Sequence, residues 1–137
     1  MLRVAADPEA RNRKRARDIP AISGRLKRPV LTIHTLGDLF VPFSMEQIYA
    51  RRAARHERSH WLVQRAIREV GHCAFTPQEA VQTFSDLVNW VNTGVPAAGD
   101  NVVDPETVAG ASYGCQFTNP KNRPSLLGLG PVAGPCP

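Results

Sequence analysis

Two stretches of this chain have the hydrophobic pattern of strands, and a helical pattern follows each of them. Pro29–Thr35 is a short, continuous apolar run, rich in Val, Leu and Ile and bounded by breakers, which is typical of a fully buried strand. Such runs are characteristic of parallel sheets that are covered on both faces. Trp61–Ile67 is a second strand candidate with a weaker pattern, because the polar Gln64 and Arg65 interrupt it.

The first helical pattern lies between the two strand candidates. Ser44 and Gln47 have the serine-x-x-glutamine spacing of a capping box. We therefore predict a helix that begins at Ser44 and runs to about Arg55. One side of this helix carries the apolar residues Met45, Ile48, Tyr49 and Ala53.

The second helical pattern has clear signals at both ends. Thr76 is placed to cap the helix, Pro77 takes its first position, and Glu79 completes a capping box. Gly94 is placed to end it. Between these ends runs one apolar stripe, which consists of Val81, Phe84, Leu87, Val88 and Val91.

The order of strand, helix, strand and helix predicts an α/β fold, with a partial parallel sheet and flanking helices. We divide the chain into a basic polar lead-in (1–22), an α/β segment (23–118) and a Pro/Gly-rich tail (119–137). Residues 95–118 are expected to be loop, with a short extended piece around Gly114–Thr118. The tail contains little that could be buried, and we predict that it is disordered.

Charge divides the chain into two unequal parts. Up to His72 there are 15 Lys and Arg against 7 Asp and Glu, and beyond it there are 2 against 5. The clusters Arg11–Arg17 and Arg51–Arg68 leave open a non-catalytic basic binding module. The Arg11–Arg17 cluster has no interleaved aromatic residues, and Arg51–Arg68 is a candidate for a basic face. We expect solvated charge and no nucleic-acid partner.

No run of residues is long and apolar enough to predict a membrane-spanning helix, and we expect no membrane partner. The amino-terminal residues show no apolar stretch followed by a cleavage site. The chain as given is therefore expected to be cytoplasmic, while secretion of a parent protein stays open.

The three cysteines are Cys73, Cys115 and Cys136, an odd number whose spacing fits no zinc pattern. We expect free, buried cysteines. A bridge between Cys73 and Cys115 is the alternative if a parent protein is exported.

An acidic residue and a histidine follow the two strand candidates in order. Asp38 comes just after the first strand, next to Gly37, and His72 follows the second strand on a glycine bend. The carboxyl ends of parallel strands meet at one edge of a sheet, so the two side chains should lie close together there. A carboxylate that orients an imidazole is the base half of a Ser-His-Asp triad. Each residue alone is an ordinary loop residue, and the ordered pair carries the hypothesis.

These residues also carry a resemblance to a family. Pro29–Pro42, with the sequence P-V-L-T-I-H-T-L-G-D-L-F-V-P, resembles the penultimate-strand segment of α/β-hydrolases. Gly71–Thr76 resembles the segment that bears the catalytic histidine in bacterial members, and Thr76–Gly94 resembles their closing helix. The resemblance covers roughly residues 20–118 and suggests the carboxyl-terminal segment of that fold.

The resemblance implies catalytic roles for two residues. Asp38 would be the triad acid and His72 the triad base, while His34 and Val41-Pro42 match structural positions. The implied activity is hydrolysis of a small-molecule ester, thioester or amide, and no cofactor is implied.

One part of the family pattern is missing. In this fold the nucleophile precedes the acid and the histidine, on a G-x-S-x-G elbow between a strand and a helix. Such a string does exist at Gly110–Gly114, around Ser112, but it follows His72 and has no strong strand before it. We interpret it as a coincidence of small loop residues. The chain is thus expected to be inactive alone and to need a partner chain carrying the nucleophile half, or to self-associate through uncovered surfaces.

A zinc-dependent peptidase is the competing hypothesis. His56-Glu57-x-x-His60 is a literal H-E-x-x-H string, and Glu79 lies at the spacing of a third ligand. The motif falls where the first helix should end, and arginines crowd it. Glu79 is also already used in a helix cap. We therefore predict that this string binds no zinc.

Overall fold

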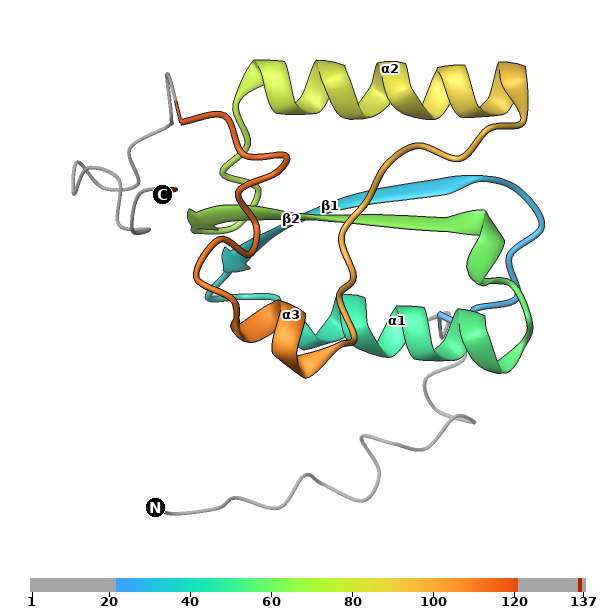
Figure 1. Ribbon diagram of the computed structural model, residues 1–137, viewed down its shortest axis with the longest axis horizontal. Coiled ribbons are helices and arrows are strands. Elements are labelled where there is room, and N and C mark those ends of the chain that lie inside the picture. The colour runs from blue at the N-terminus through green and yellow to red at the C-terminus, as the bar shows by residue number, and fades with distance from the viewer. Residues whose placement is uncertain (1–21, 121–135, 137) are drawn as a thin grey trace, which may run out of the picture.

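The computed structural model describes residues 22–120 and Cys136. The lead-in predicted for 1–22 and the disordered tail predicted for 119–137 fall almost wholly outside these described residues. The helices and strands follow one another in the order β1 (Val30–Gly37), α1 (Ser44–Arg55), the 3-10 turn η2 (Ser59–Trp61), β2 (Leu62–Val70), α2 (Pro77–Thr93) and α3 (Pro105–Ala109) (Figure 1).

The centre of the fold is a sheet of two parallel strands. The pairing begins with Val30 opposite Leu62 and continues to Thr35 opposite Ile67, after which the register shifts. The helix α2 covers one face of the sheet, and α1 covers the other (Figure 1). The structure therefore has the expected α/β mixture, with a small parallel sheet between helices.

The segment that follows α2 covers the outer edge of β2. The backbone amide of Asp100 donates to the carbonyl of Gln64 at 2.8 Å, and the Asp100 carboxylate accepts from the amide of Ala66 at 2.8 Å. Further along, the hydroxyl of Thr118 accepts from the amide of Arg68 at 2.8 Å. These bonds replace a neighbouring strand, and the centre of β2 is accordingly buried although the strand has only one strand partner.

The opposite strand, β1, is less buried than its sequence predicts. Only Thr35 is buried, and the other residues of the strand are half-buried. The expectation of a fully buried strand is therefore wrong for the described chain. The reason is that β1 pairs with β2 alone, so no described strand covers its outer edge.

The two polar residues that weaken the β2 pattern are buried inside the strand. The Gln64 amide nitrogen donates to the carbonyl of Glu46 at 2.9 Å. The Arg65 guanidinium donates to the carbonyl of Ala98 at 3.0 Å and pairs with Asp86 at 2.7 Å. Hydrogen bonds to segments distant in the sequence thus offset the cost of burying these groups.

The first helix has the predicted bounds but a different start. Phe43 is the N-cap of α1, and no side chain accepts a hydrogen bond at this end, so the capping box predicted at Ser44 is wrong. The Phe43 ring instead packs edge-on against His34 and Tyr113, with centroids 5.7 and 6.1 Å away. Packing against the core, rather than a local cap, fixes where this helix begins.

The second helix is capped as predicted. Thr76 and Glu79 form the reciprocal capping box, and Gly94 ends the helix with a φ of 74°. The helix buries Glu79 and Trp90, however, and leaves much of its predicted apolar stripe in solvent. Phe84 is 68% exposed and Val91 is 59% exposed.

The segment after α2 differs from its prediction in two places. A short helix, α3, forms where loop was expected, because the Asp104 side chain caps it by accepting from the amide of Thr107. The extended piece predicted around Gly114–Thr118 is wrong, because this stretch forms turns.

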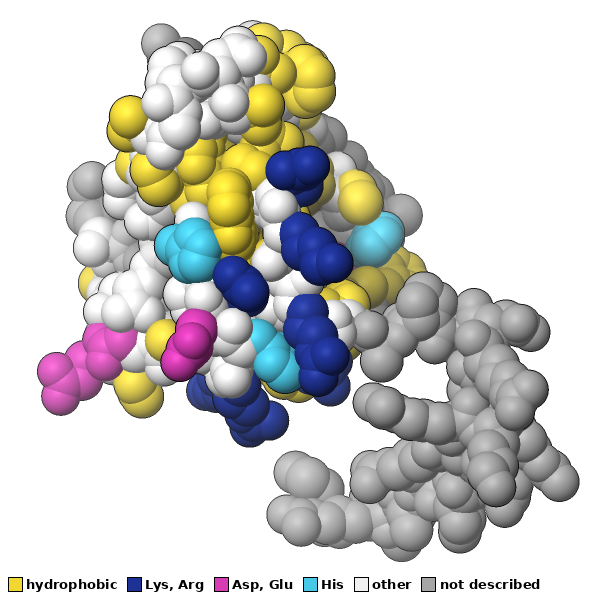
Figure 2. All heavy atoms as spheres, turned by 90° about the vertical axis from the view of Figure 1, so that its right-hand side faces the viewer, with side chains coloured by type: hydrophobic (Ala, Val, Ile, Leu, Met, Phe, Trp, Pro, Cys, Tyr) yellow, Lys and Arg dark blue, Asp and Glu magenta, His cyan; other side chains and the backbone are white. Residues whose placement is uncertain are grey.

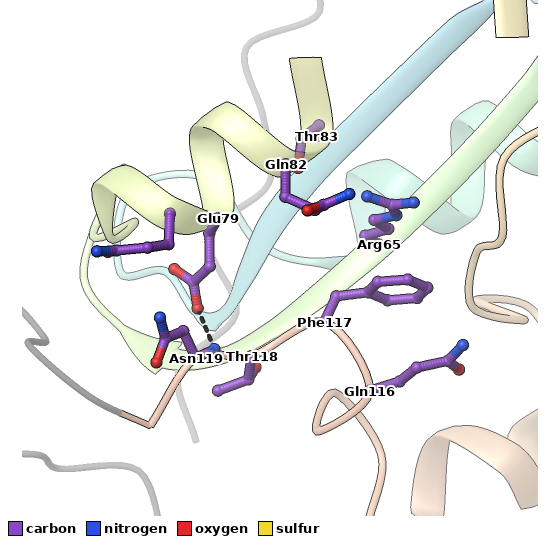
Figure 3. A pocket seen from close by; sticks show the side chains of 9 residues that line it. Arg65, Glu79, Gln82, Thr83, Gln116, Phe117, Thr118 and Asn119 are labelled. Atoms are coloured by element: carbon purple, nitrogen blue, oxygen red, sulfur yellow. Dashed lines mark hydrogen bonds between the residues drawn. The ribbon is translucent and has the colours of Figure 1, made fainter. Parts of the chain in front are cut away.

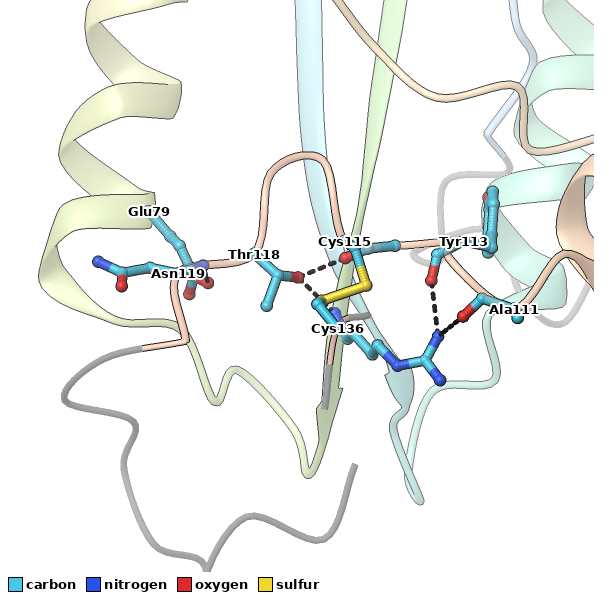
Figure 4. Close-up of a disulfide and its surroundings, with 9 residues drawn as sticks. Glu79, Ala111, Tyr113, Cys115, Thr118, Asn119 and Cys136 are labelled. Atoms are coloured by element: carbon cyan, nitrogen blue, oxygen red, sulfur yellow. Dashed lines mark hydrogen bonds between the residues drawn. A yellow bond between two sulfur atoms is a disulfide. The ribbon is translucent and has the colours of Figure 1, made fainter. Parts of the chain in front are cut away.

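The cysteines also differ from their prediction. Cys115 and Cys136 form a disulfide, with their Cα atoms 5.6 Å apart (Figure 4). Cys73 is free but exposed, so the expectation of free, buried cysteines is wrong. The spacing of cysteines along a sequence does not determine which of them meet in the fold.

Among the described helices, none has the length and apolar character needed to cross a membrane.

Candidate catalytic site

The two strands end side by side, and hydrogen bonds hold their exit loops together. The backbone amide of Gly71 donates to the carbonyl of Gly37 at 3.3 Å. The buried hydroxyl of Thr35 donates to the carbonyl of Gly71 at 2.7 Å. Gly71 has a φ of 104°, in a region that side chains disfavour, so glycine suits this bend. The loops after β1 and β2 therefore leave the sheet at one defined place.

Asp38 and His72 meet at this place. The imidazole Nδ1 of His72 lies 2.8 Å from Oδ2 of Asp38. The contact that their order in the sequence predicts is thus confirmed. The side chain of Asp38 is only 4% exposed, whereas that of His72 is 49% exposed. The carboxylate is therefore enclosed, and the imidazole presents one side to solvent.

The second oxygen of Asp38 fixes the carboxylate in place. Oδ1 accepts from the backbone amides of Phe40 at 2.8 Å and Val41 at 2.9 Å. Desolvation raises the pKa of Asp38, but the Val41 amide, His72 and the Phe40 amide outweigh it and lower the pKa to about 2. The carboxyl group is therefore ionised at neutral pH, with one oxygen held by the backbone and the other directed at His72.

An ionised Asp38 determines how a neutral His72 carries its proton. Since a carboxylate only accepts hydrogen bonds, Nδ1 is the donor, and the lone pair of the ring is on Nε2. The Phe40 ring lies nearly perpendicular to the imidazole, with the two ring centroids 5.9 Å apart. An imidazole held in this way, with its Nε2 lone pair available, has the arrangement that general-base chemistry requires.

The groups that hold this pair were not identified from the sequence. The two amides that bind Asp38 form an aspartate turn over residues 38–41, a local pattern that is common in loops. The turn alone does not distinguish a catalytic aspartate from any other. The Thr35 hydroxyl could not have been found, because its partner Gly71 is 36 positions away.

His34 has a structural role. Its Nδ1 lies 2.8 Å from the backbone carbonyl of the next residue, Thr35, and its ring packs against Phe43. It therefore contacts the residue that precedes α1.

Ser112 lies elsewhere in the molecule. It stands on an exposed turn after α3, where it helps to line a cavity of about 430 Å³ together with Asp100 and Thr107. Neither Asp38 nor His72 lines this cavity. Within residues 22–120, no hydrogen bond joins Ser112 to His72. Among the described residues, the G-x-S-x-G string thus shares neither a hydrogen bond nor this cavity with His72.

The H-E-x-x-H residues do not lie on one helix. His56 is the C-cap of α1, Glu57 has a positive φ of 57°, and His60 belongs to the 3-10 turn η2. Glu79 is buried in the α2 cap, where it accepts from the backbone amide of Thr76 at 2.7 Å. In the part of the chain that the structure describes, no group of three or more potential metal ligands lies together.

The basic residues do not form one face. Arg51, Arg55 and Arg58 are exposed on α1 and the turn after it. Arg65 is buried, and Arg68 donates to the carbonyls of Ala111 at 2.9 Å and Tyr113 at 3.1 Å (Figure 4). The expected basic face over Arg51–Arg68 is therefore smaller than the sequence indicated.

A separate polar cavity of about 280 Å³ lies between α2 and the segment that follows it (Figure 3). On its wall the Arg65 guanidinium stacks over Phe117, 4.2 Å from the ring centroid. Glu79 accepts from the backbone amide of Asn119 at 2.7 Å, so one carboxylate ties the helix to this segment. Because Asp38 and His72 do not line it, this cavity is not part of the catalytic candidate.

Comparison of the chain with protein-family models, with curated proteins and with solved structures finds no match. The resemblance to α/β-hydrolases therefore stands on the sequence motifs alone, and any function must be argued from the Asp38–His72 pair.

Proposed function

We propose that residues 23–118 are the carboxyl-terminal segment of an α/β-hydrolase, in which His72 is the triad base and Asp38 the triad acid. The observation that carries this proposal is the 2.8 Å contact between the His72 imidazole and an Asp38 carboxylate whose other oxygen accepts two backbone amides. The pair stands at the carboxyl ends of two adjacent parallel strands, where α/β sheets place their reactive loops.

In the complete enzyme, Nε2 of His72 would take the proton from the hydroxyl of the nucleophile as this attacks the carbonyl of the substrate. Asp38 would stabilise the resulting imidazolium through Nδ1. The imidazolium would then return the proton to the leaving group, and a second cycle with water would release the acid. No cofactor takes part in these steps.

The chain supplies only half of this machinery. The nucleophile elbow and the oxyanion donors would come from a segment encoded upstream, on the same chain or on a partner chain, because Ser112 is not joined to His72. The substrate class is a small-molecule ester, thioester or amide.

The Cys115–Cys136 disulfide supports a secreted or otherwise oxidising location for the parent protein, because such bonds persist mainly there. The cytoplasmic location expected for the chain as given is the alternative. The proposed chemistry of the Asp38–His72 pair is the same in either location.

The test is to restore the missing half. We expect the DNA upstream of this reading frame to encode a strand, G-x-S-x-G and helix segment. Joining that segment to this chain should give hydrolysis of p-nitrophenyl butyrate. Changing His72→Gln should then lower kcat at least about 10³-fold, because the nucleophile loses its base.

The matched control is His34→Gln, which removes a histidine at the structural position and should leave most of the activity. An upstream region without such a segment would contradict the proposal. So would a joined chain whose hydrolysis does not depend on His72.

A further inference from the structure

The charged residues of the described chain are unevenly distributed. Residues 22–120 contain nine Lys and Arg against nine Asp and Glu. Seven of the nine basic residues nevertheless lie in two short segments, residues 22–29 and 51–61, whose only acidic residue is Glu57. The other two are used inside the fold, since Arg65 pairs with Asp86 and Arg68 donates to backbone carbonyls.

The two basic segments meet at the end of the sheet where both strands begin. Nη1 of Arg52 in α1 donates to the carbonyl of Ile22 at 2.6 Å. Gly24 lies against the same turn of α1, so closely that an added Cβ atom would collide with the backbone of Arg52, and its φ is 75°. Glycine therefore suits this contact for two reasons. Since Val30 pairs with Leu62, the residues that lead into the two strands also lie side by side.

These contacts gather exposed cations at one end of the molecule, called here the basic patch. Figure 2 views the molecule from this end and shows Lys and Arg side chains close together, with histidines among them. Among the described residues, none of these cations forms an ion pair with a carboxylate. The basic patch consists of Arg25, Lys27, Arg28, Arg51, Arg55 and Arg58.

The basic patch carries positive charge that the fold does not compensate. Arg51 and Arg55 are four positions apart on α1, a spacing at which like charges destabilise a helix. A bound anion would remove this repulsion. The chain also enters the described part at Ile22, which is bonded to Arg52, so the six Lys and Arg of residues 1–21 precede the basic patch directly in the sequence.

The composition of the basic patch indicates a partner rich in phosphate. Five of its six residues are arginine, whose planar guanidinium group binds two phosphate oxygens at once. Docking on a membrane surface requires an apolar face beside the cations. Ile22 is the only exposed large hydrophobic residue in the two basic segments, so a membrane is disfavoured as the partner.

A pair of aromatic rings lies in the second basic segment. The rings of His60 and Trp61 in η2 have their centroids 5.2 Å apart, with His60 exposed and Trp61 half-buried. Unpaired bases stack on such rings, whereas the bases of a duplex are already stacked on each other and acidic side chains have no ring to stack. Cations beside accessible rings are typical of surfaces that bind single strands.

We propose that the basic patch binds the phosphate backbone of single-stranded nucleic acid, with the His60–Trp61 pair stacking on an unpaired base. The sequence predicted solvated charge, because it did not show that residues 22–29 lie against the end of α1 and double the number of exposed cations there. The proposal goes beyond the hydrolase function and does not depend on it. Asp38 and His72 follow the carboxyl ends of the strands, whereas the basic patch lies at their amino ends.

The test is the fluorescence anisotropy of a labelled oligothymidylate of about 20 nucleotides, titrated with the full-length chain at several salt concentrations. The logarithm of the binding constant should fall with the logarithm of the salt concentration with a slope of about −4 or steeper, since each contact to a single-strand phosphate contributes about −0.7. The double variant Arg55→Gln/Arg58→Gln should raise Kd at least about tenfold and make the slope shallower by about 1.

Two further variants separate charge from position and from stacking. Gln78→Glu/Ser85→Glu lowers the net charge by the same amount at exposed positions of α2, and it should leave Kd within about twofold. His60→Ala removes an exposed ring and should raise Kd at least about fivefold with little change in the salt slope.

Nuclear magnetic resonance of the unmodified chain gives a measurement that needs no variant. The oligothymidylate should shift the amide signals of residues 24–28 and 55–61 and leave that of His72 in place. No binding at about 50 mM salt would overturn the proposal. Equal losses of affinity in the arginine variant and in the α2 control would overturn it too, as would binding that is equally tight with a DNA duplex, poly-L-glutamate or phosphatidylserine vesicles.

Discussion

Backbone amides of its own loop determine the position of the Asp38 carboxylate. Two amides of its own loop hold one oxygen, and the imidazole of His72 meets the other. The residue therefore has two roles, because it closes the loop after β1 and also orients the histidine after β2.

The first prediction concerns the dependence of stability on pH. The pKa of Asp38 is about 2 in the fold, below the ordinary value of 3.8, so folding favours the ionised carboxylate. Its contribution to stability should be complete above about pH 5 and should be lost as the pH falls through 3.8 toward 2. Thermal unfolding of the unmodified chain and of Asp38→Asn, measured from pH 2 to 7, should show a difference that shrinks in this window.

A tautomer measurement separates the two roles of Asp38. In the unmodified chain at pH 8, the ¹⁵N shifts of His72 should show the proton on Nδ1, and Asp38→Asn should weaken that preference. An unchanged pH dependence, or a proton on Nε2, would mean that the carboxylate does not hold the imidazole in solution.

At the scale of the elements, α2 is defined mainly by its own sequence. The Thr76 hydroxyl accepts from the Glu79 amide at 3.2 Å, and the Glu79 carboxylate accepts from the Thr76 amide. This cap is buried and follows His72 by only four positions, so it also fixes where the histidine loop ends.

The second prediction is that Thr76→Ala lowers the free energy of unfolding by about 1 kcal/mol, through the loss of the N-cap. Urea unfolding followed by circular dichroism would measure it. Thr93→Ala, at the exposed end of the same helix, is the control and should stay within about 0.5 kcal/mol. Equal losses in the free energy of unfolding for Thr76→Ala and Thr93→Ala would show that the N-cap does not stabilise the helix more than the exposed Thr93 does.

The third prediction concerns the disulfide. Peptide mapping without reductant should find Cys115 joined to Cys136, while Cys73 reacts with iodoacetamide. Reduction should lower the free energy of unfolding by up to about 3 kcal/mol, because the bond closes a loop of about 20 residues. Cys73→Ser should keep the bond and serves as the control for thiol exchange. A bridge that involves Cys73 would contradict the structure.

The elements that the sequence predicts well are those whose signals are local. The bounds of α2 follow from a cap, a proline and a glycine, and the position of β1 follows from its apolar run. The meeting of Asp38 and His72 follows from the order of the strands, because parallel strands bring their carboxyl ends together.

The features that the sequence did not predict depend on contacts between distant segments. Gln64 and Arg65 disturb the strand pattern, yet Glu46, Ala98 and Asp86 satisfy them in the fold. The sequence also did not show which way the apolar stripe of α2 faces. Such a stripe predicts a buried side of the helix, but it does not indicate which element covers that side.

At the scale of the whole molecule, the chain holds an Asp38–His72 pair with no serine hydrogen-bonded to it among the described residues. Asp38 and His72 lie at one end of the sheet. The G-x-S-x-G string lies on a turn, and no hydrogen bond among the described residues connects Ser112 to His72. The Asp38–His72 pair, the candidate catalytic half-site, is therefore separate from the only sequence in this chain that resembles a nucleophile motif.

The fourth prediction is that the isolated chain shows no ester hydrolysis that depends on Ser112. Without the elbow there is neither a positioned hydroxyl nor an oxyanion site. Initial rates with p-nitrophenyl acetate should be equal for the unmodified chain and for Ser112→Ala. A rate that Ser112→Ala abolishes would show that the base reaches this serine and would overturn the half-site hypothesis.

The hydrogen bonds that Asp100 and Thr118 make to β2 have a consequence for how copies of the chain can assemble. A sheet with two open edges can add strands without limit and grow into a fibre, since each added copy exposes a new edge. Here one edge is already occupied by the chain itself. Pairing of two copies through the remaining edge would leave no open strand edge among residues 22–120, so such pairing would stop at two copies. Light scattering should accordingly reach a plateau at rising concentration, where an open-ended polymer would continue to climb.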